Sequence, residues 1–316
     1  MPGMNLRQGR VIDPILTQHA RGYENAEFVA TRIAPVVPVP VRGFNVLQFD
    51  KSSFRRKNTR RAMGASTLRV QYGYGAKPAE LAQHRLEAVS PNELAEEAQA
   101  MTGIDFAGES VQMVQDVIGL EVECEAASIL CNPANYPSGH RIALSGSDQW
   151  SWSGSKPTEN IDNAKEVVRR AIGKRPNVLL LAPGAFKAAR NHPLIVERFK
   201  YTGRDAITAQ MLAAFWELDE VIIGDAVYLN EDEPESASAH DVWDNIAILS
   251  YRPKGASYRQ PGFAYTYRKR GFPAVETGYE ERNINSQVNP VTDEVRPYLV
   301  GPDAGFLFSN VVAAEE

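Results

Sequence analysis

Residues 105–131 read DFAGESVQMVQDVIGLEVECEAASILC, a stretch without proline in which apolar residues recur every three or four positions. This spacing is typical of one amphipathic helix, about 40 Å long. One apolar row comprises Ala107, Val111, Val114, Ile118, Val122, Ala126 and Ile129, and a second comprises Phe106, Met113, Val117, Leu120 and Cys124. The opposite side is marked by Glu109, Gln112, Asp116, Gly119 and Glu123. Two apolar rows are wider than a coiled-coil seam, so the pattern predicts a helix that supports a β-sheet.

A strongly cationic segment precedes this helix. Residues 51–61 read KSSFRRKNTRR, and the stretch from Lys51 to Ala79 holds eight Lys and Arg but no Asp or Glu, in a chain with a formal net charge of -5. Alternating stretches at 44–49 and 68–72 flank the cations, which predicts a long two-stranded excursion. Such a hairpin is marginally stable alone and needs a partner surface. The cations favour either a nucleic acid or an acidic protein surface.

The remaining sequence divides into an arm, a helix-and-sheet unit and a tail of strands. Residues 32–43, RIAPVVPVPVRG, contain three prolines that exclude a helix and favour an extended arm. After a turn-rich stretch, the pattern predicts a compact unit from about Ser155 to Tyr251, with a strand at Val178–Leu181 and a helix that stops at Gly173. From Phe263 onward short strands return, and we expect all of them to rejoin the sheet of the long helix.

Composition indicates an ordinary globular chain. It has 316 residues, of which 43% are hydrophobic and 23% charged, enough for two domains with a sizeable core. No apolar stretch approaches the roughly 18 residues of a membrane span, and the first residues lack the apolar run of a signal peptide. We therefore expect a chain that is soluble in a cytoplasm.

Catalytic and metal-binding motifs are missing from the sequence. The five histidines lie far apart and have no cysteine pair to join them, so no metal site is predicted. Residues 73–78, GYGAKP, lack the third glycine of a dinucleotide fingerprint and carry a proline where a helix should begin. Acidic pairs such as Glu121 and Glu125 are better explained as solvated helix faces. We predict no catalytic residues, no cofactor and no enzymatic activity.

Four stretches carry a resemblance to a known family. They are NPANYP at 132–137, LSGSDQW at 144–150, KRPNVLLLAP at 174–183 and NHPLIVERFKYTGRDAITAQMLAAFWELDEVIIGDAVY at 191–228. In this order and spacing they resemble the major capsid proteins of tailed bacteriophages. The resemblance is close from about Asp105 to Tyr251 and looser, though consistent in layout, through the rest of the chain.

The resemblance implies an α+β chain with the tailed-phage major capsid fold. That fold has an N-terminal arm, an extended β-hairpin loop, a peripheral domain with a long spine helix, and an axial α/β domain. On this sequence the implied boundaries are 1–43 for the arm, 44–76 for the extended loop, 77–154 with 256–316 for the peripheral domain, 105–131 for its spine helix, and 155–255 for the axial domain.

The resemblance also implies a structural function. The chain would assemble with itself into hexamers and pentamers of an icosahedral head shell that encloses phage double-stranded DNA, in the host cytoplasm during assembly and then in the virion. Implied partners are a separate scaffolding protein, because the arm begins almost at Met1, a portal protein, decoration proteins, and DNA held non-specifically on the inner face, with no membrane. The cations Lys51, Arg55, Arg56, Lys57, Arg60 and Arg61 are the predicted inter-subunit contact.

Three alternatives remain open at this point. The chain could be an enzyme built on its α/β unit, which would require convergent titratable groups in a pocket. It could bind nucleic acid without sequence preference through the cationic segment. It could also be an encapsulin, a bacterial protein compartment with the same fold, distinguished by a pocket for a cargo peptide.

Overall fold

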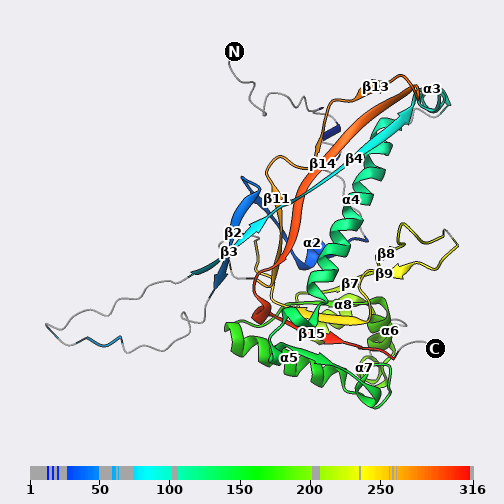
Figure 1. Ribbon diagram of the computed structural model, residues 1–316. Helices are drawn as coiled ribbons and strands as arrows, with labels where there is room; N and C mark the ends of the chain where they lie inside the picture. Colours follow the sequence, from blue (N-terminus) through cyan, green and yellow to red (C-terminus); the bar gives the residue numbers. More distant parts are fainter. Residues whose placement is uncertain are drawn as a thin grey trace.

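One long helix and two larger β-sheets organise the protein (Figure 1). The computed structural model describes residues 13, 16–17, 20, 27–49, 59–61, 63, 74–101, 106–200, 207–234, 236–255, 257, 260 and 262–313. Helix α4 spans Phe106–Leu130, which confirms the continuous helix predicted over residues 105–131.

A six-stranded sheet lies against α4, and its central strand is β14 (Ser286–Leu299). β14 pairs antiparallel with β4 (Ala82–Pro91) over ten residue pairs, so these two strands form a long two-stranded ladder beside the helix. Three further strands also pair with β14, and β1 pairs parallel to one of them, β11. Their bounds are Val36–Val39 for β1, Ala264–Lys269 for β11, Ala274–Val275 for β12 and Tyr279–Glu281 for β13.

The sheet covers one side of α4 only. Val111, Val114 and Ile118 pack with Ala88 and Val291 from β4 and β14, and they are at most 5% exposed, which confirms the first predicted row. The second row is partly wrong, because Met113 is 65% and Val117 53% exposed. The physical reason is that a single flat sheet meets a helix along one stripe, so an apolar residue on the far side stays in solvent.

The second sheet has five strands in the order β5-β15-β10-β6-β7. Its strands span Arg141–Ala143 (β5), Val178–Leu181 (β6), Glu220–Ile223 (β7), Ile246–Ser250 (β10) and Gly305–Ser309 (β15). Helices accompany it at Pro157–Ile172 (α5), Pro183–Asn191 (α6), Pro193–Phe199 (α7) and Ala209–Phe215 (α8).

Strand β6 is apolar throughout because it separates two cores. Leu179 and Leu181 join a core built with the surrounding helices, whereas Val178 and Leu180 join a core that includes Leu130 at the end of α4. A strand that is covered on both faces loses the usual alternation of polar and apolar residues. The long helix therefore ends inside the second unit, and the two sheets share a continuous interior.

The C-terminal strand corrects one expectation. β11, β12 and β14 do form the sheet against α4, but β15 pairs with β10 and β5 in the second sheet. The expectation that all of the tail rejoins the sheet of the long helix is therefore wrong for residues 305–309. Phe308 lies 5.9 Å from Trp150 between ring centroids, so β15 fills the helix-side core with its aromatic residues.

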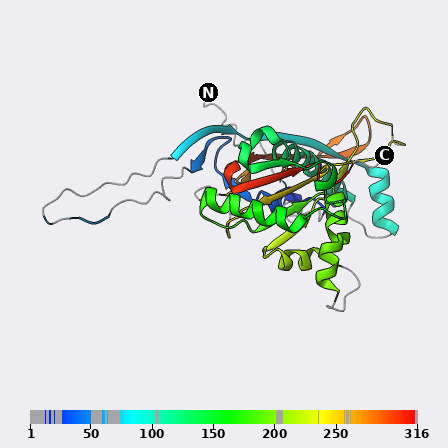
Figure 2. The same ribbon diagram turned by 90° about the horizontal axis from the view of Figure 1, so that it is seen from below.

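Two short ribbons leave the body on opposite sides of α4, and both views show this separation (Figures 1 and 2). One is formed by β2 (Gly43–Phe49) and β3 (Tyr74–Glu80), and the other by β8 (Val227–Tyr228) and β9 (His240–Asp241). Other elements within the described residues are α2 (Ala30–Ile33), α3 (Asn92–Met101) and single 3-10 turns at Pro133–Asn135, Ser138–His140, Gly146–Asp148 and Pro302–Ala304.

The two sides of α4 should respond differently to the same substitution. Val114→Asp places an unpaired charge against the sheet, and we expect it to lower the free energy of unfolding by about 3–5 kcal/mol. Met113→Asp, one residue earlier on the exposed side, should change it by less than about 0.5 kcal/mol. Urea unfolding of the purified chain measures both, and equal losses would contradict the assignment of faces.

Candidate functional site

The root of the predicted extended loop is held firmly on the six-stranded sheet. β2 and β3 pair antiparallel from Gly43 opposite Glu80 to Phe49 opposite Tyr74. The Phe44 ring lies 4.6 Å from that of Tyr267 and 6.2 Å from that of Tyr298, between centroids. The Tyr298 hydroxyl accepts a hydrogen bond from the Glu80 backbone N–H at 3.1 Å and donates one to the Glu80 carbonyl at 2.7 Å. These contacts fix the direction in which the ribbon leaves the body.

Of the six predicted contact residues, the structure describes two. Arg60 and Arg61 are exposed. Lys51, Arg55, Arg56 and Lys57 lie outside the described residues. The six cations therefore remain a predicted contact surface, attached to a root whose position is known.

A buried carboxylate joins three separate parts of the chain. Glu123 on α4 is 1% exposed, and its Oε1 accepts hydrogen bonds from Val29 N–H at 2.9 Å and Trp243 Nε1–H at 2.6 Å. Its Oε2 accepts a bond from Ala30 N–H at 2.8 Å. The long helix, the start of α2 and the segment before β10 thus meet at one side chain.

Burial dominates the acidity of Glu123. It raises the pKa of the carboxyl group above the ordinary 4.5, and the hydrogen bonds from Ala30, Val29 and Trp243 only partly offset this. A carboxylate without these three donors would be far more costly to bury, because water no longer solvates it. The site is therefore a structural junction that depends on complete hydrogen bonding.

Sequence reasoning missed this junction, since it placed Glu123 on the polar side of the helix. The available signal was Gly119, one turn earlier on the same face. A Cβ at Gly119 would lie 2.7 Å from the Phe28 ring, so the glycine marks the place where the chain before α2 crosses the helix. What reads as a solvated face is the docking face of that segment.

A second junction, formed by ion pairs, ties α2 to the second sheet. Glu220 on β7 accepts hydrogen bonds from Arg32 at 2.6 Å and Arg252 at 2.7 Å. Burial raises the pKa of Glu220, but the two guanidinium groups outweigh burial and leave the pKa below 4.5. α2 is thus tied both to the long helix and to the second sheet.

One serine–histidine pair resembles a nucleophile and base but has a different arrangement. Ser155 Oγ lies 3.1 Å from His192 Nε2, and both residues are buried. His192 Nδ1 accepts a bond from Leu194 N–H, so the ring proton resides on Nε2 and points toward Ser155 and the Trp152 carbonyl. A protonated Nε2 cannot take a proton from the serine, so the pair holds the loop before α7.

Other site types are also missing from the described part of the chain. Its His, Cys, Asp and Glu side chains form no group of three that could hold a metal ion. Among the described helices, none combines the length and apolarity needed to cross a bilayer.

Comparison with known proteins identifies the family. No family model matches the chain. The chain is 33% identical over 308 residues to the major capsid protein of Burkholderia phage BcepMu, across 96% of this chain and 97% of that protein. The chain belongs to the phage major capsid proteins. As a capsid protein it has a structural role, and the virion capsid is where it resides.

Solved structures agree with the fold of a capsid protein. The capsid chain is similar to a phage-related protein from Bordetella bronchiseptica, with a TM-score of 0.83 and 38% identity, covering 96% of this chain and 98% of the other. It is also similar to the SrpI encapsulin of Synechococcus elongatus, with a TM-score of 0.55 and 14% identity over 91% and 88% of the two chains. At that identity the encapsulin likeness concerns the fold alone, so it supports the compartment alternative less than the phage relatives support a capsid.

The Glu123 junction predicts a pH-dependent difference between two variants. Because the folded pKa is raised, the folded chain holds a proton that the unfolded chain releases, so stability falls as pH rises above 4.5 through the folded pKa. Glu123→Gln has no such titration and sets an amide N–H₂ against a backbone or indole donor, which should cost about 1–3 kcal/mol. The free energy of unfolding of the wild type should therefore exceed that of Glu123→Gln by the largest amount at pH 5. This difference between the two variants should become smaller toward pH 8.

Urea unfolding followed by tryptophan fluorescence measures this gap. Glu121→Gln, an exposed position on the same helix, is the matched control and should show no gap that varies with pH in this way. A gap for Glu123→Gln that widens as pH rises would contradict the stated direction of the pKa.

Proposed function

We propose that the chain is the shell subunit of an icosahedral phage head, which forms hexamers and pentamers around double-stranded DNA and turns over no substrate. In this proposal residues 1–43 form the arm, 44–76 the extended loop, 77–154 with 256–316 the peripheral domain and 155–255 the axial domain. β15 pairs with β10 and β5 pairs with β15, so two strands from the proposed peripheral ranges extend the sheet of the proposed axial domain.

The observation that carries this proposal is the ribbon of β2 and β3. Its root is fixed by Phe44, Tyr267 and Tyr298, yet its paired strands point away from the rest of the chain (Figure 1). A two-stranded ribbon gains little stability alone, so its distal part requires a surface from another molecule. In a shell, that surface belongs to an adjacent subunit.

In this proposal the cations of residues 51–61 bind an adjacent subunit and do not serve mainly to bind DNA. Lys51, Arg55, Arg56, Lys57, Arg60 and Arg61 are concentrated near the middle of one excursion, whereas a wall that holds DNA would spread its charges over the inner surface. Each exposed ion pair is worth at most about 1 kcal/mol. A shell repeats the contact in every subunit, so a small change per contact affects assembly as a whole.

The other partners follow from the family and are part of the same proposal. A separate scaffolding protein, a portal protein and decoration proteins would act on the shell, and assembly would take place in the host cytoplasm. The encapsulin alternative has only the shared fold in its favour.

Reversing the charge of the loop tests the proposal. Arg55→Glu, Arg56→Glu, Arg60→Glu and Arg61→Glu together should leave the circular dichroism spectrum of the subunit unchanged but abolish shells in electron micrographs of co-expression lysates. The matched control replaces the same four residues by Lys, which keeps the charge and should still assemble. If the reversed variant forms normal shells that merely fail to retain DNA, the cations face the genome and the proposal is wrong.

A further inference from the structure

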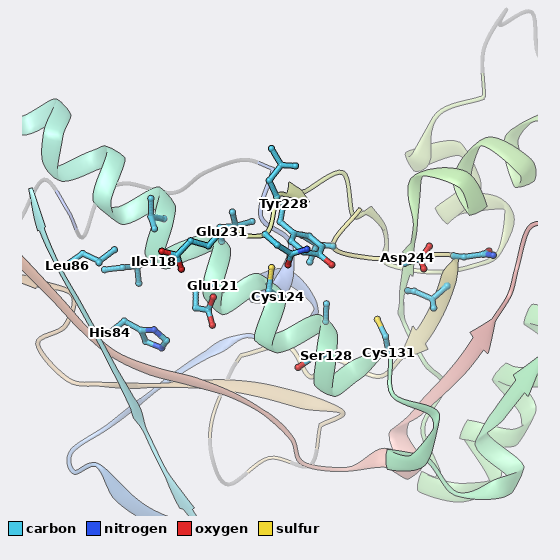
Figure 3. Close-up of a pocket in the computed structure, with 18 of the residues that line it drawn as sticks. His84, Leu86, Ile118, Glu121, Cys124, Ser128, Cys131, Tyr228, Glu231 and Asp244 are labelled. Carbon is cyan, nitrogen blue, oxygen red and sulfur yellow. The ribbon is translucent and has the colours of Figure 1, made fainter. Parts of the chain in front are cut away.

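A groove of about 1000 Å³ runs along α4, between this helix, strand β4 of the six-stranded sheet and the second unit (Figure 3). Its walls are α4, β4 and the chain from β8 to β10. Leu86, Val117 and Leu120 give it an apolar lining, and Leu86 and Val117 are 41% and 53% exposed. Exposed apolar side chains gathered in a groove are a common sign of a protein contact.

The groove is also acidic. Glu121, Glu231 and Asp244 line it and are exposed, and none of their carboxylates has a hydrogen bond or ion pair with a residue that the structure describes. Among the described residues that line the groove, Arg85 is the one Arg or Lys. Its guanidinium group already donates a hydrogen bond to the Glu276 carboxylate at 3.2 Å. Among the residues that the structure describes, these three carboxylates therefore have no Arg or Lys partner, although His84 also lines the groove.

Burial and nearby carboxylates raise the pKa values of the two thiols in the groove, Cys124 and Cys131. Burial raises the pKa of Cys124, and Glu121 and Glu123 raise it further. Burial also raises the pKa of Cys131 to about 12, with Asp244 adding to the effect. Figure 3 shows Glu121 and Cys124 on α4, with Glu231 and Asp244 coming from the chain that faces the helix.

We propose that this groove receives residues 51–61 of a neighbouring copy of the chain. That segment, KSSFRRKNTRR, combines six cations with Phe54, so it matches both the carboxylates and the apolar lining. The inference rests on the proposed function, in which the extended loop binds an adjacent subunit, and it names the surface that the loop meets.

The length of the loop is sufficient for this contact. Residues 50–73 connect the paired ends Phe49 and Tyr74, and an excursion out and back over these residues can extend up to about 40 Å. The ribbon points away from the groove of its own subunit, because β2 and β3 leave on the side opposite to β8 and β9 (Figures 1 and 2). The occupant must therefore come from another copy.

The position of the two surfaces also determines the type of contact. A loop on one side and a groove on the other make a head-to-tail interface, in which each subunit uses both surfaces with different neighbours. Such an interface closes into a ring when the rotation between subunits allows it. A ring of identical contacts is the arrangement expected of a hexamer or pentamer.

Another acidic candidate fits less well. Glu93 on α3 belongs to an acidic run, but its carboxylate already accepts a bond from Asn285 Nδ2 at 2.7 Å. The segment 230–236 is the other acidic run, and its Glu231 lines the groove. The groove therefore offers carboxylates that are available for a partner.

A charge swap tests the pairing in assembled shells. Glu121→Arg with Glu231→Arg should reduce shell yield by at least about tenfold, since cations would then face the cationic loop. Combining this pair with Arg55→Glu and Arg56→Glu should restore a substantial part of the yield. Glu109→Arg with Asp148→Arg, at exposed positions outside the groove, should leave yield unchanged.

The outcomes separate this inference from the proposed function. If loop reversal blocks assembly but groove reversal does not, the loop binds elsewhere on the neighbour and the inference is wrong while the proposed function stands. If loop reversal leaves shells intact, the proposed loop contact fails and the inference fails with it. Circular dichroism of each subunit shows whether a loss of shells reflects misfolding.

A disulfide crosslink gives a second measurement that needs no charge change. In a background with Cys124→Ser and Cys131→Ser, shells carrying Ser53→Cys and Val117→Cys should form a ladder of linked subunits on a non-reducing gel after oxidation. Mixed shells, in which each copy carries one of the two cysteines, should give linked dimers. The control pairs Ser53→Cys with Glu109→Cys, which lies on the same helix but outside the groove. Equal crosslinking at residue 109, or none at 117 in intact shells, would overturn the inference.

Discussion

The structure depends on a carboxylate that water cannot reach. Glu123 on α4 accepts three hydrogen bonds from two other segments: Val29 and Ala30 at the start of α2, and Trp243 before β10. Loss of any one donor would leave the buried carboxylate with fewer hydrogen bonds than its burial requires. This requirement fixes the start of α2 and Trp243, which precedes β10, against the same point of α4. The arm side of the chain and the second sheet are therefore positioned by one side chain rather than by apolar packing alone, which tolerates small shifts.

The same helix links the two surfaces that the capsid subunit uses in our proposals. β2 and β3 are rooted on Tyr267 and Tyr298, which belong to β11 and β14, and β14 packs under α4. The groove lies along the same helix, where the helix meets β4 and the chain from β8 to β10. Loop and groove are thus held by one rigid layer of helix and sheet, so the position of one surface determines the position of the other. Ion pairs such as Arg296 with Glu125, at 2.8 Å, reinforce the link between β14 and α4.

Local periodicity predicted α4, β6 and the ribbon strand β2, because hydrogen bonding within a helix and apolar runs depend on neighbouring residues. It could not tell that Met113 and Val117 are exposed, since it reports which residues are apolar and not which face a distant strand will cover. It assigned β15 to the wrong sheet, because the strands that pair with β15 are distant in sequence: β10 lies about sixty residues earlier, and β5 lies earlier still. The cationic loop was visible as a local excess of charge, whereas the groove combines Glu121 with Glu231, more than a hundred residues apart.

The path of the chain from β3 into β4 has a mechanical consequence. β3 ends at Glu80 and β4 begins at Ala82, so tension on the ribbon passes almost directly along β4. β4 lies antiparallel to β14 over ten residue pairs, and a pull along its axis loads this ladder in shear. In shear the bonds of a ladder must break nearly together, whereas a pull across the strands would peel them one at a time. A subunit drawn outward by its neighbour therefore resists with the combined strength of the whole ladder.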